Sequence, residues 1–348
     1  IIWIGTGQGI ARYEGNKFHV IKAVKGDSSK LHDAYLYDMF EDSKGRIWIM
    51  TNSGGLSVYT PSDGKIKTFL NNSSDKNSIP DNSIRKVIEV NGNIWIASHS
   101  SGFAKYNENK QNFTRYFSEG DHPFRAVSSV IADHSGIFWV STEGRGLIRI
   151  SKDMKSYKQF MPDGTANSIH SKDVYDLYED AYNNIWIASQ KGIRVLDERR
   201  EKFNRPGITA LPPVLESGIV NRMLFIENRE IWFSTIEGLY KFDLSKRTVE
   251  HIALKAQTGE DFSRTNITRL AVDKTGMIWA GSPFYGAFCL YKDERKIKGF
   301  TVNEVPGKTL SSKVIRSLYS DKKGYLWAGT QDKGLNRINL KTGIIDIF

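Results

Sequence analysis

The ten residues "DKKGYLWAGT" (321–330) join a charged turn to Trp327, two small residues and a hydroxyl. The same phrase recurs as "DSKGRIWIMT" (42–51), "DHSGIFWVST" (133–142) and "DKTGMIWAGS" (273–282). Looser copies are "NGNIWIAS" from residue 91, "YNNIWIAS" from 182, "NREIWFST" from 228 and "IIWIGT" from 1. All eight tryptophans of the chain stand in copies of this phrase.

The spacing of the tryptophans indicates a repeat architecture. Successive tryptophans are 45, 47, 44, 47, 46, 47 and 48 residues apart. Self-similarity at such a fixed period is typical of solenoids, propellers and other repeat arrays, and it overrides a domain count based on length alone. The repeated tryptophans are Trp3, Trp48, Trp95, Trp139, Trp186, Trp232, Trp279 and Trp327.

One repeat divides into four short strands. Around Trp48 these are "YLYDMFED" (35–42), "RIWIMT" (46–51), "LSVYT" (56–60) and "KIKTFL" (65–70). The segments between them carry Gly, Asn, Pro and Asp, which favour turns. No stretch has a helical period of ten or more residues, so the chain is predicted to be all-β.

The second strand of each repeat predicts how the repeats pack. "IFWV", "IWIA" and "IWFS" are almost continuously apolar, which is typical of strands buried on both faces. Packing four-stranded antiparallel sheets face to face around an axis provides this burial and protects the strand edges. We therefore predict a β-propeller in which each tryptophan is structural, as a wedge between neighbouring blades.

The number of blades is open at this point. Eight second strands carry tryptophan, but only seven first strands are found, beginning near Tyr35, Ile84, Val127, Val174, Val220, Ile267 and Ile315. We favour seven blades, with the strand at 314–321 completing the strands of residues 1–22 and with 325–348 opening a second propeller. The alternative has eight blades, one of them a strand short. Because the chain begins inside a repeat without Met, we expect residues 1–348 to be one propeller domain of a longer protein.

The repeated phrase, Asp-x-x-Gly-x-(Ile/Leu)-Trp-(Ile/Ala)-Gly-Thr followed by Gly-Leu, resembles the two-component regulator propeller repeat. "WIGTGQGIARYEGNKFHV" (3–20) is similar to the opening blade of that family, and "NSIPDNSIRKVIEV" and "NSIHSKDVYDLYED" to its blade junctions. The Asp is replaced around Trp95 and Trp232. The resemblance implies the periplasmic sensor of a Bacteroidetes-type hybrid histidine kinase, which detects oligosaccharides. It also implies a further propeller and a kinase in the same protein, and a homodimer through that protein.

Composition and motifs exclude several other classes. Metal and catalytic signatures such as H-E-x-x-H, C-x-x-C and G-x-S-x-G are missing, and Cys289 is the only cysteine. Each turn offers one carboxylate, whereas calcium requires six to eight oxygen ligands. We therefore expect no cofactor, no metal and no enzymatic activity. We also expect no nucleic-acid partner and no membrane insertion; neither a signal peptide nor an apolar run of 18 residues occurs in the chain. The net charge of +10 favours an anionic partner.

The candidate ligand site is one mouth of the central channel of the predicted propeller. At this mouth the first strands begin, and the loops between second and third strands lie beside them. Arg222, Arg269 and Arg316 recur every 47 residues, and we expect them to present guanidinium groups from adjacent blades to this mouth. Arginine binds carboxylate or sulfate bidentately, so we expect a uronate-bearing or sulfated oligosaccharide. Solvated strand ends are the alternative. The full set of candidates is Tyr37, Arg85, Lys86, His99, Arg145, Tyr175, Arg222, Arg269, Tyr285 and Arg316.

Three functions are compatible with these predictions. The favoured one is a non-enzymatic ligand-sensing domain. The second is a glycan lyase or glycosidase on a propeller scaffold, for which paired carboxylates in the mouth would be the sign. The third is a protein-interaction scaffold, for which a large exposed apolar patch would be the sign.

Overall fold

The computed structural model describes residues 1–6, 9–118, 120, 122–197, 202–204, 206, 211–227, 229–254, 260–290, 297–300, 307–321 and 323–348. The chain divides into two compact units. The first comprises residues 1–163 with 172–174, and the second comprises 164–171 with 175–348.

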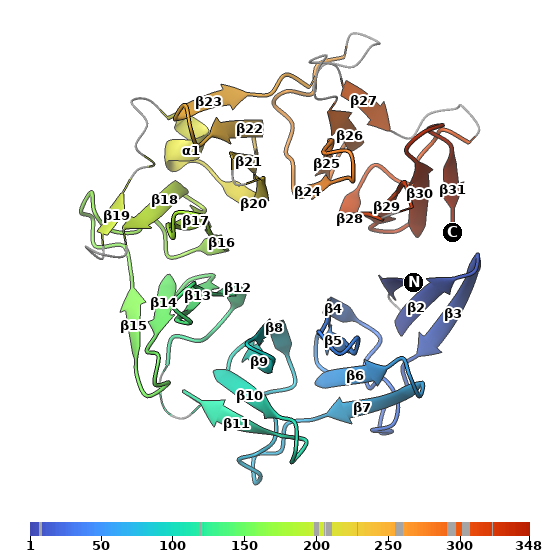
Figure 1. Ribbon diagram of the computed structural model, residues 1–348, viewed down its shortest axis with the longest axis vertical. Coiled ribbons are helices and arrows are strands. Elements are labelled where there is room, and N and C mark those ends of the chain that lie inside the picture. Colours follow the sequence, from blue (N-terminus) through green and yellow to red (C-terminus); the bar gives the residue numbers. More distant parts are fainter. Residues whose placement is uncertain are drawn as a thin grey trace. The chain divides into compact units, whose positions relative to one another are not determined.

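The first unit contains blades one to four, each an antiparallel sheet in chain order (Figure 1). Blade one consists of β1 (Ile2–Thr6), β2 (Gly9–Glu14) and β3 (Lys17–Lys22). Blade two is β4 (Leu36–Glu41), β5 (Ile47–Thr51), β6 (Leu56–Thr60) and β7 (Lys65–Phe69). Blade three is β8 (Ile84–Val90), β9 (Asn93–Ser98), β10 (Phe103–Asn107) and β11 (Asn112–Tyr116). Blade four is β12 (Val127–Ala132), β13 (Phe138–Thr142), β14 (Leu147–Ile150) and β15 (Tyr157–Phe160).

The second unit contains blades five to eight and one short helix, α1 (Pro213–Ser217). Blade five is β16 (Val174–Glu179), β17 (Ile185–Ser189), β18 (Gly192–Asp197) and β19 (Lys202–Asn204). Blade six is β20 (Val220–Ile226), β21 (Glu230–Thr235), β22 (Gly238–Asp243) and β23 (Thr248–His251). Blade seven is β24 (Arg269–Val272), β25 (Ile278–Ser282), β26 (Gly286–Leu290) and β27 (Ile297–Phe300). Blade eight is β28 (Ile315–Ser320), β29 (Tyr325–Thr330), β30 (Leu335–Asn339) and β31 (Ile345–Ile347).

The prediction of an all-β propeller with four-stranded antiparallel blades is confirmed, but the favoured count of seven blades is wrong. The structure has eight blades, and blade one has three strands. The difference lies in β28, which pairs with β29 of its own blade. Closing this short hairpin orders far less chain than pairing β28 with a strand some 300 residues away. Residues 325–348 supply β29, β30 and β31 to blade eight; that they open a second propeller stays a prediction.

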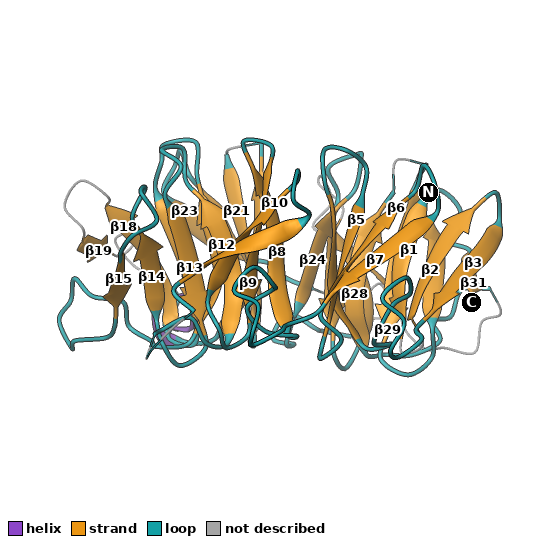
Figure 2. Ribbon diagram, turned by 90° about the horizontal axis from the view of Figure 1, so that it is seen from below, coloured by secondary structure: helices purple, strands orange, loops and turns teal. Residues whose placement is uncertain are grey.

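Each blade has two loop-bearing ends (Figure 2). We call the end where the first strand begins the entry end, and the end with the turn between the first and second strands the turn end. At the entry end, the residue after the second strand donates its N–H to the carbonyl just before the first strand. This bond joins Asn52 to Tyr35 at 3.0 Å and His99 to Ser83 at 2.7 Å. The loop after the second strand is thereby held beside the start of the first strand.

A turn aspartate bonds the buried tryptophan in five blades, and in blade six Glu230 accepts the indole bond of Trp232 at 3.1 Å. In blade two, Asp42 accepts N–H bonds from Lys44 and Arg46 and a 2.8 Å bond from the indole of Trp48. The sequence predicts the turn cap but not the indole bond. A constant six-residue spacing is the signal that could have shown it. The five pairs are Asp42–Trp48, Asp133–Trp139, Asp180–Trp186, Asp273–Trp279 and Asp321–Trp327.

The tryptophans lie in apolar clusters between consecutive blades. Trp48 of blade two packs in one cluster with Val87 and Ile94 of blade three, and all three are nearly inaccessible. Trp186 packs with Phe233 and Phe242 of blade six. Trp3, in the three-stranded blade, is only half buried. Burial against the next blade explains why the phrase keeps its tryptophan.

The turn carboxylates Asp42 and Asp133 make stability depend on pH. Burial alone would raise the pKa of Asp133, but bonds from Ser135, Trp139 and Ile137 outweigh burial and lower this pKa below its ordinary value of 3.8. A carboxyl whose folded pKa is depressed stabilises the fold above its unfolded pKa, and this contribution is lost as the pH falls through the folded pKa. We expect the free energy of unfolding to drop below about pH 4.

Urea unfolding between pH 7 and pH 2.5 measures this dependence. Asp133→Asn should be less stable than the wild type at pH 7, and its stability should fall less steeply in acid because one titrating group is gone. Parallel curves for the two proteins would contradict the role of Asp133.

Candidate functional site

A β-bulge marks the second residue of the first strand in five blades. In blade two Leu36 pairs with Thr51 and Asp38 with Met50, which leaves Tyr37 without a cross-strand partner. A bulge of this kind bends the strand and redirects the extra side chain. The bulged residues are Tyr37, Arg85, Ser128, Asn221 and Arg316.

In the first unit, two bulged residues from consecutive blades meet. The guanidinium of Arg85 lies 4.2 Å from the centre of the Tyr37 ring, a cation–π contact that contributes about 0.5–1 kcal/mol at an exposed site. Arg85 also donates to the Asn52 side-chain oxygen across a long 3.4 Å. Tyr37 is 48% exposed. The cluster Tyr37, Arg85 and Asn52 therefore presents an aromatic ring and a weakly bound guanidinium to solvent at the entry end.

The residues that follow these bulges form an ion pair. Lys86 of blade three lies 3.2 Å from Asp38 of blade two, and both side chains are more than a third exposed. Pairs of this type contribute about 0–1 kcal/mol. Lys86 is consequently neutralised in part, and Arg85 carries the uncompensated positive charge of this cluster.

The three arginines of the second unit do not occupy equivalent positions. Arg222 pairs with Ser234 and Arg269 with Gly281, one residue past the bulge position. In blade eight the corresponding residue is Ser317, and Arg316 is the bulged residue itself. The equal spacing of 47 residues hides this shift, because blade eight has one more residue before its first strand.

The partners of these arginines also differ. Arg269 donates to the carbonyl oxygens of Thr268 and Arg316. Arg316 donates to the side-chain oxygen of Gln331. Arg222 is exposed, and its side chain forms no hydrogen bond or ion pair with any residue that the structure describes. Of the three, Arg222 has the guanidinium most available to an anion.

The remaining candidates lie in or near entry-end loops. His99 and Arg145 follow second strands and are half buried. Tyr175 is the second residue of β16 and is also half buried. Tyr285 is 44% exposed, and its ring lies 6.4 Å from that of Phe284. The structure thus brings together Tyr37 with Arg85, and Arg269 with Arg316.

Two aspartates that shape the entry end were missed in the sequence. Asp33 accepts bonds from the N–H and hydroxyl of Ser53, at 3.1 and 3.0 Å. Asp81 accepts the same pair of bonds from Ser100, at 3.0 and 3.2 Å. Burial opposes the effect, but these and neighbouring bonds lower the pKa of Asp33. Both aspartates lie three residues before a first strand, and this shared position could have indicated them in the sequence.

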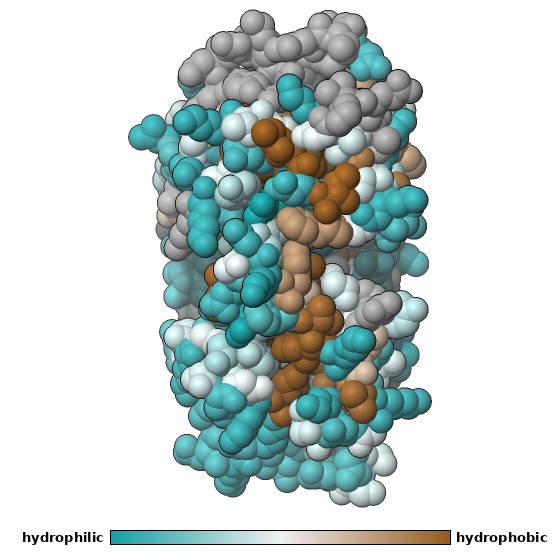
Figure 3. Space-filling view, turned by 90° about the vertical axis from the view of Figure 1, so that its right-hand side faces the viewer, coloured by the Kyte–Doolittle hydropathy of each residue, from teal (hydrophilic) through white to brown (hydrophobic). Residues whose placement is uncertain are grey.

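Exposed apolar side chains are the expected sign of an interaction scaffold, and Figure 3 shows such side chains on one face. In the first unit Val20 of β3 is 55% exposed. In the second unit Ile347 of β31 and the adjacent Phe348 are 50% and 45% exposed. Others lie on first strands, such as Tyr319 of β28 at 56%, or in loops, such as Tyr35 and Tyr182 at 70% and 71%. Among the described residues, no group of three or more His, Cys, Asp or Glu could hold a metal ion, and no helix could cross a membrane.

Comparison with known proteins identifies the repeats. Residues 30–53, 168–191 and 309–332 match the model of the two-component regulator propeller. Over 157 residues the chain is 27% identical to histidine kinase P4 of Formosa agariphila, a stretch covering 43% of this chain and 11% of the kinase.

Solved structures show the same fold. The extracellular domain of BT3049 from B. thetaiotaomicron, assigned to a hybrid two-component system, has a TM-score of 0.62 at 21% identity over 99% of this chain and 45% of that one. PorZ, a surface component of the type-IX secretion system of Porphyromonas gingivalis, has a TM-score of 0.56 at 17% identity, over 98% and 51% of the two chains. The designed protein Ika8 has a TM-score of 0.60 at 10% identity, over 93% and 87%.

The chain spans about a tenth of the kinase and less than half of BT3049. Its matched segments each hold the first strand, the turn end and the second strand of one blade. It is a β-propeller in which three blades contain segments that match the two-component regulator propeller model.

Proposed function

We propose that this propeller is a sensory domain of a hybrid two-component histidine kinase, that it lies in the periplasm, and that it binds an acidic oligosaccharide at the entry end. The observation that carries the proposal is the exposed cluster of Tyr37, Arg85 and Asn52. A tyrosine face suits a sugar ring, and a guanidinium forms charge-assisted bonds with carboxylate or sulfate. The regulator repeats, the kinase relative and the extracellular domain of BT3049 support the sensory role and the location.

The electrostatics favour an anion over a neutral sugar. Arg85 has only the Tyr37 ring and one long bond among the described residues, and Arg222 is exposed. The net charge of +10 adds a long-range attraction for anions. Exposed charge pairs are screened over about 10 Å at 0.1 M salt, so binding should weaken as salt rises.

Calorimetric titration with matched acidic and neutral oligosaccharides tests the proposal. Arg85→Ala should weaken binding of the acidic oligosaccharide about tenfold or more, since a hydrogen bond to a charged group contributes about 1.5–3 kcal/mol. Arg222→Ala should weaken it less, because Arg222 does not belong to the cluster of Tyr37, Arg85 and Asn52.

The control is Lys65→Ala, which removes the same charge from an exposed turn-end pair with Asp63 and should leave affinity unchanged. Tighter binding of the neutral sugar, or full affinity in Arg85→Ala, would show that the cluster is a solvated strand end and not a binding site for an acidic oligosaccharide. Cleavage of the oligosaccharide during the titration would instead favour a lyase or glycosidase.

A further inference from the structure

Blade three has no carboxylate that accepts the indole bond of its tryptophan. The turn between β8 and β9 carries Asn91 and Gly92, with φ values of 50° and 72°, in place of the aspartate turn of blade two. Trp95 is 8% exposed, and its indole N–H donates to none of the described residues. A buried donor without a partner is uncommon in native proteins and requires an explanation. Trp95 is thus a donor whose acceptor is missing.

Blade six shows where the missing carboxylate would lie. There Glu230, two residues before Trp232 on β21, accepts the indole bond at 3.1 Å. The residue two before Trp95 on β9 is Asn93, and residues two apart on a strand point to the same face. The Asn93 amide donates instead to the carbonyl oxygen of Asn91 at 3.0 Å. The acceptor for the Trp95 N–H is therefore missing at the side chain of residue 93.

The cation beside this tryptophan also lacks the carboxylate that its equivalents have. In blade six Lys241 of the third strand lies opposite the tryptophan and pairs with Glu250 of the fourth strand at 3.1 Å, and the equivalent pair of blade eight is 2.7 Å apart. In blade three Lys105 lies over the tryptophan ring, 5.6 Å from its centre. Its fourth-strand partner is Thr114, and it forms no ion pair with any residue that the structure describes. Blade three thus lacks two carboxylates on one face.

A cavity of about 420 Å³ lies at this position of blade three, within the range of about 300–1,000 Å³ typical of small-molecule sites. Asn93, Lys105 and Thr114 are among its lining residues. Glu108 is the one carboxylate among the lining residues that the structure describes, and it bonds to Arg46 at 2.7 and 3.0 Å. Because Arg46 balances the charge of Glu108, the cavity offers an unpaired ammonium, a hydroxyl and an amide to a negatively charged ligand.

We propose that this cavity binds a small dicarboxylate, such as succinate. One carboxylate accepts the indole bond of Trp95, in the place that Glu230 fills in blade six. The other pairs with Lys105, in the place of Glu250. Charge-assisted bonds of both kinds are roughly twice as strong as neutral ones. This site lies at the turn end, goes beyond the entry-end site and does not depend on it.

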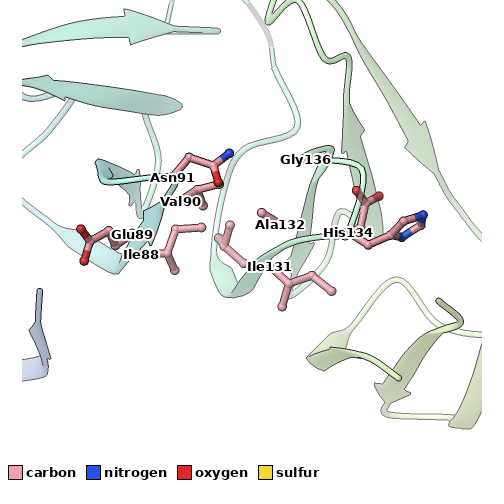
Figure 4. A pocket seen from close by; sticks show the side chains of 10 residues that line it. Ile88, Glu89, Val90, Asn91, Ile131, Ala132, His134 and Gly136 are labelled. Carbon is pink, nitrogen blue, oxygen red and sulfur yellow. The ribbon is translucent and has the colours of Figure 1, made fainter. Parts of the chain in front are cut away.

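A second cavity beside the same turn does not suit an anion. It lies between β8 and β12, and its lining includes Glu89, Asp133 and His134 but, among the described residues, no Lys or Arg. Figure 4 shows Glu89 and His134 on opposite sides of this space. An anion there would face two carboxylates without an ammonium or guanidinium group. The charge of the ligand therefore assigns it to the cavity of Lys105.

Two-dimensional ¹⁵N NMR of the indole N–H groups tests the proposal on the chain as it stands. The resonance of Trp95, identified by its loss in Trp95→Phe, should shift saturably as succinate is added. Succinamide, the neutral isostere, should bind at least tenfold more weakly. Acetate should also bind at least tenfold more weakly, because it carries only one of the two carboxylates.

Two substitutions remove the site, and each has a matched control. Asn93→Glu supplies an internal carboxylate at the position of Glu230, so it should lower succinate affinity at least tenfold while its melting temperature does not fall. Asn93→Gln has the same length without the charge and should keep the affinity. Lys105→Met should lower the affinity at least tenfold, whereas Lys110→Met, which removes an exposed lysine of the same blade, should keep it.

Arg85→Ala should also keep succinate affinity, which distinguishes failure here from failure of the entry-end site. Absence of a saturable shift of the Trp95 resonance would overturn the proposal. So would equal shifts with succinate and succinamide, or wild-type affinity in either Asn93→Glu or Lys105→Met.

Discussion

Trp186→Ala is expected to lower the free energy of unfolding by about 3–5 kcal/mol, the usual cost of removing a large buried aromatic side chain. Trp186 is 3% exposed and packs with Phe233 and Phe242 across a blade junction of the second unit. Its indole also donates to Asp180 at 2.7 Å. The alanine variant loses both the ring contacts and the bond to the carboxylate.

Trp186→Phe is the matched control, because it keeps a six-membered aromatic ring in the cluster and removes the five-membered ring with its N–H. It should cost about 1.5–3 kcal/mol, the range for one lost bond to a charged group. Chemical denaturation of the three proteins gives the comparison. Equal losses in the alanine and phenylalanine variants would show that the ring does not hold the two blades together.

Gly55→Ala is expected to cost about 2–5 kcal/mol. Gly55 has a φ of +79°, and a Cβ at this position would lie 2.2 Å from the carbonyl oxygen of Phe69. The left-handed conformation costs about 1–2 kcal/mol for a residue with a Cβ, and overpacking adds about 1–3 kcal/mol. In other blades a glycine at or just before the start of the third strand lies equally close to a carbonyl oxygen of the neighbouring outer segment. The pairs are Gly9 with Ile21, Gly286 with Phe300 and Gly334 with Phe348.

Gly45→Ala separates the two costs within the same blade. Gly45 has a φ of +74°, and a Cβ added there would meet no atom of the described residues within 4 Å. Its substitution should therefore cost only the conformational part, about 1–2 kcal/mol. Thermal and urea unfolding of both variants measure the difference. If Gly55→Ala loses no more than Gly45→Ala, the close approach to β7 is not a constraint on the blade.

Local pattern in the sequence predicted the fold. The strands, their turns and the tryptophan of each blade depend on residues fewer than about 50 positions apart, so a single repeat contains the information for them. The Asp–Trp bond, such as Asp42 to Trp48, is equally local. Its six-residue spacing was visible in the sequence, although its meaning became clear only when the side chains were placed.

Contacts between blades could not be predicted in the same way. Residue spacing does not show that Arg85 stacks on Tyr37 or that Lys86 pairs with Asp38. Equal spacing also suggested that Arg316 and Arg222 are equivalent, whereas one extra residue before β28 places Arg316 at the bulge itself and Arg222 follows the bulge. A shift of one residue in a strand sends a side chain to the other face.

The sequence by itself determined the fold class, the blade unit and the buried tryptophans, because these follow from hydrophobic period and turn chemistry within each repeat. The tertiary structure decided the number of blades and the partners of the candidate arginines. Each of these depends on which strand edges and side chains are in contact across a junction. A difference of one residue in a turn or a bulge changes those contacts.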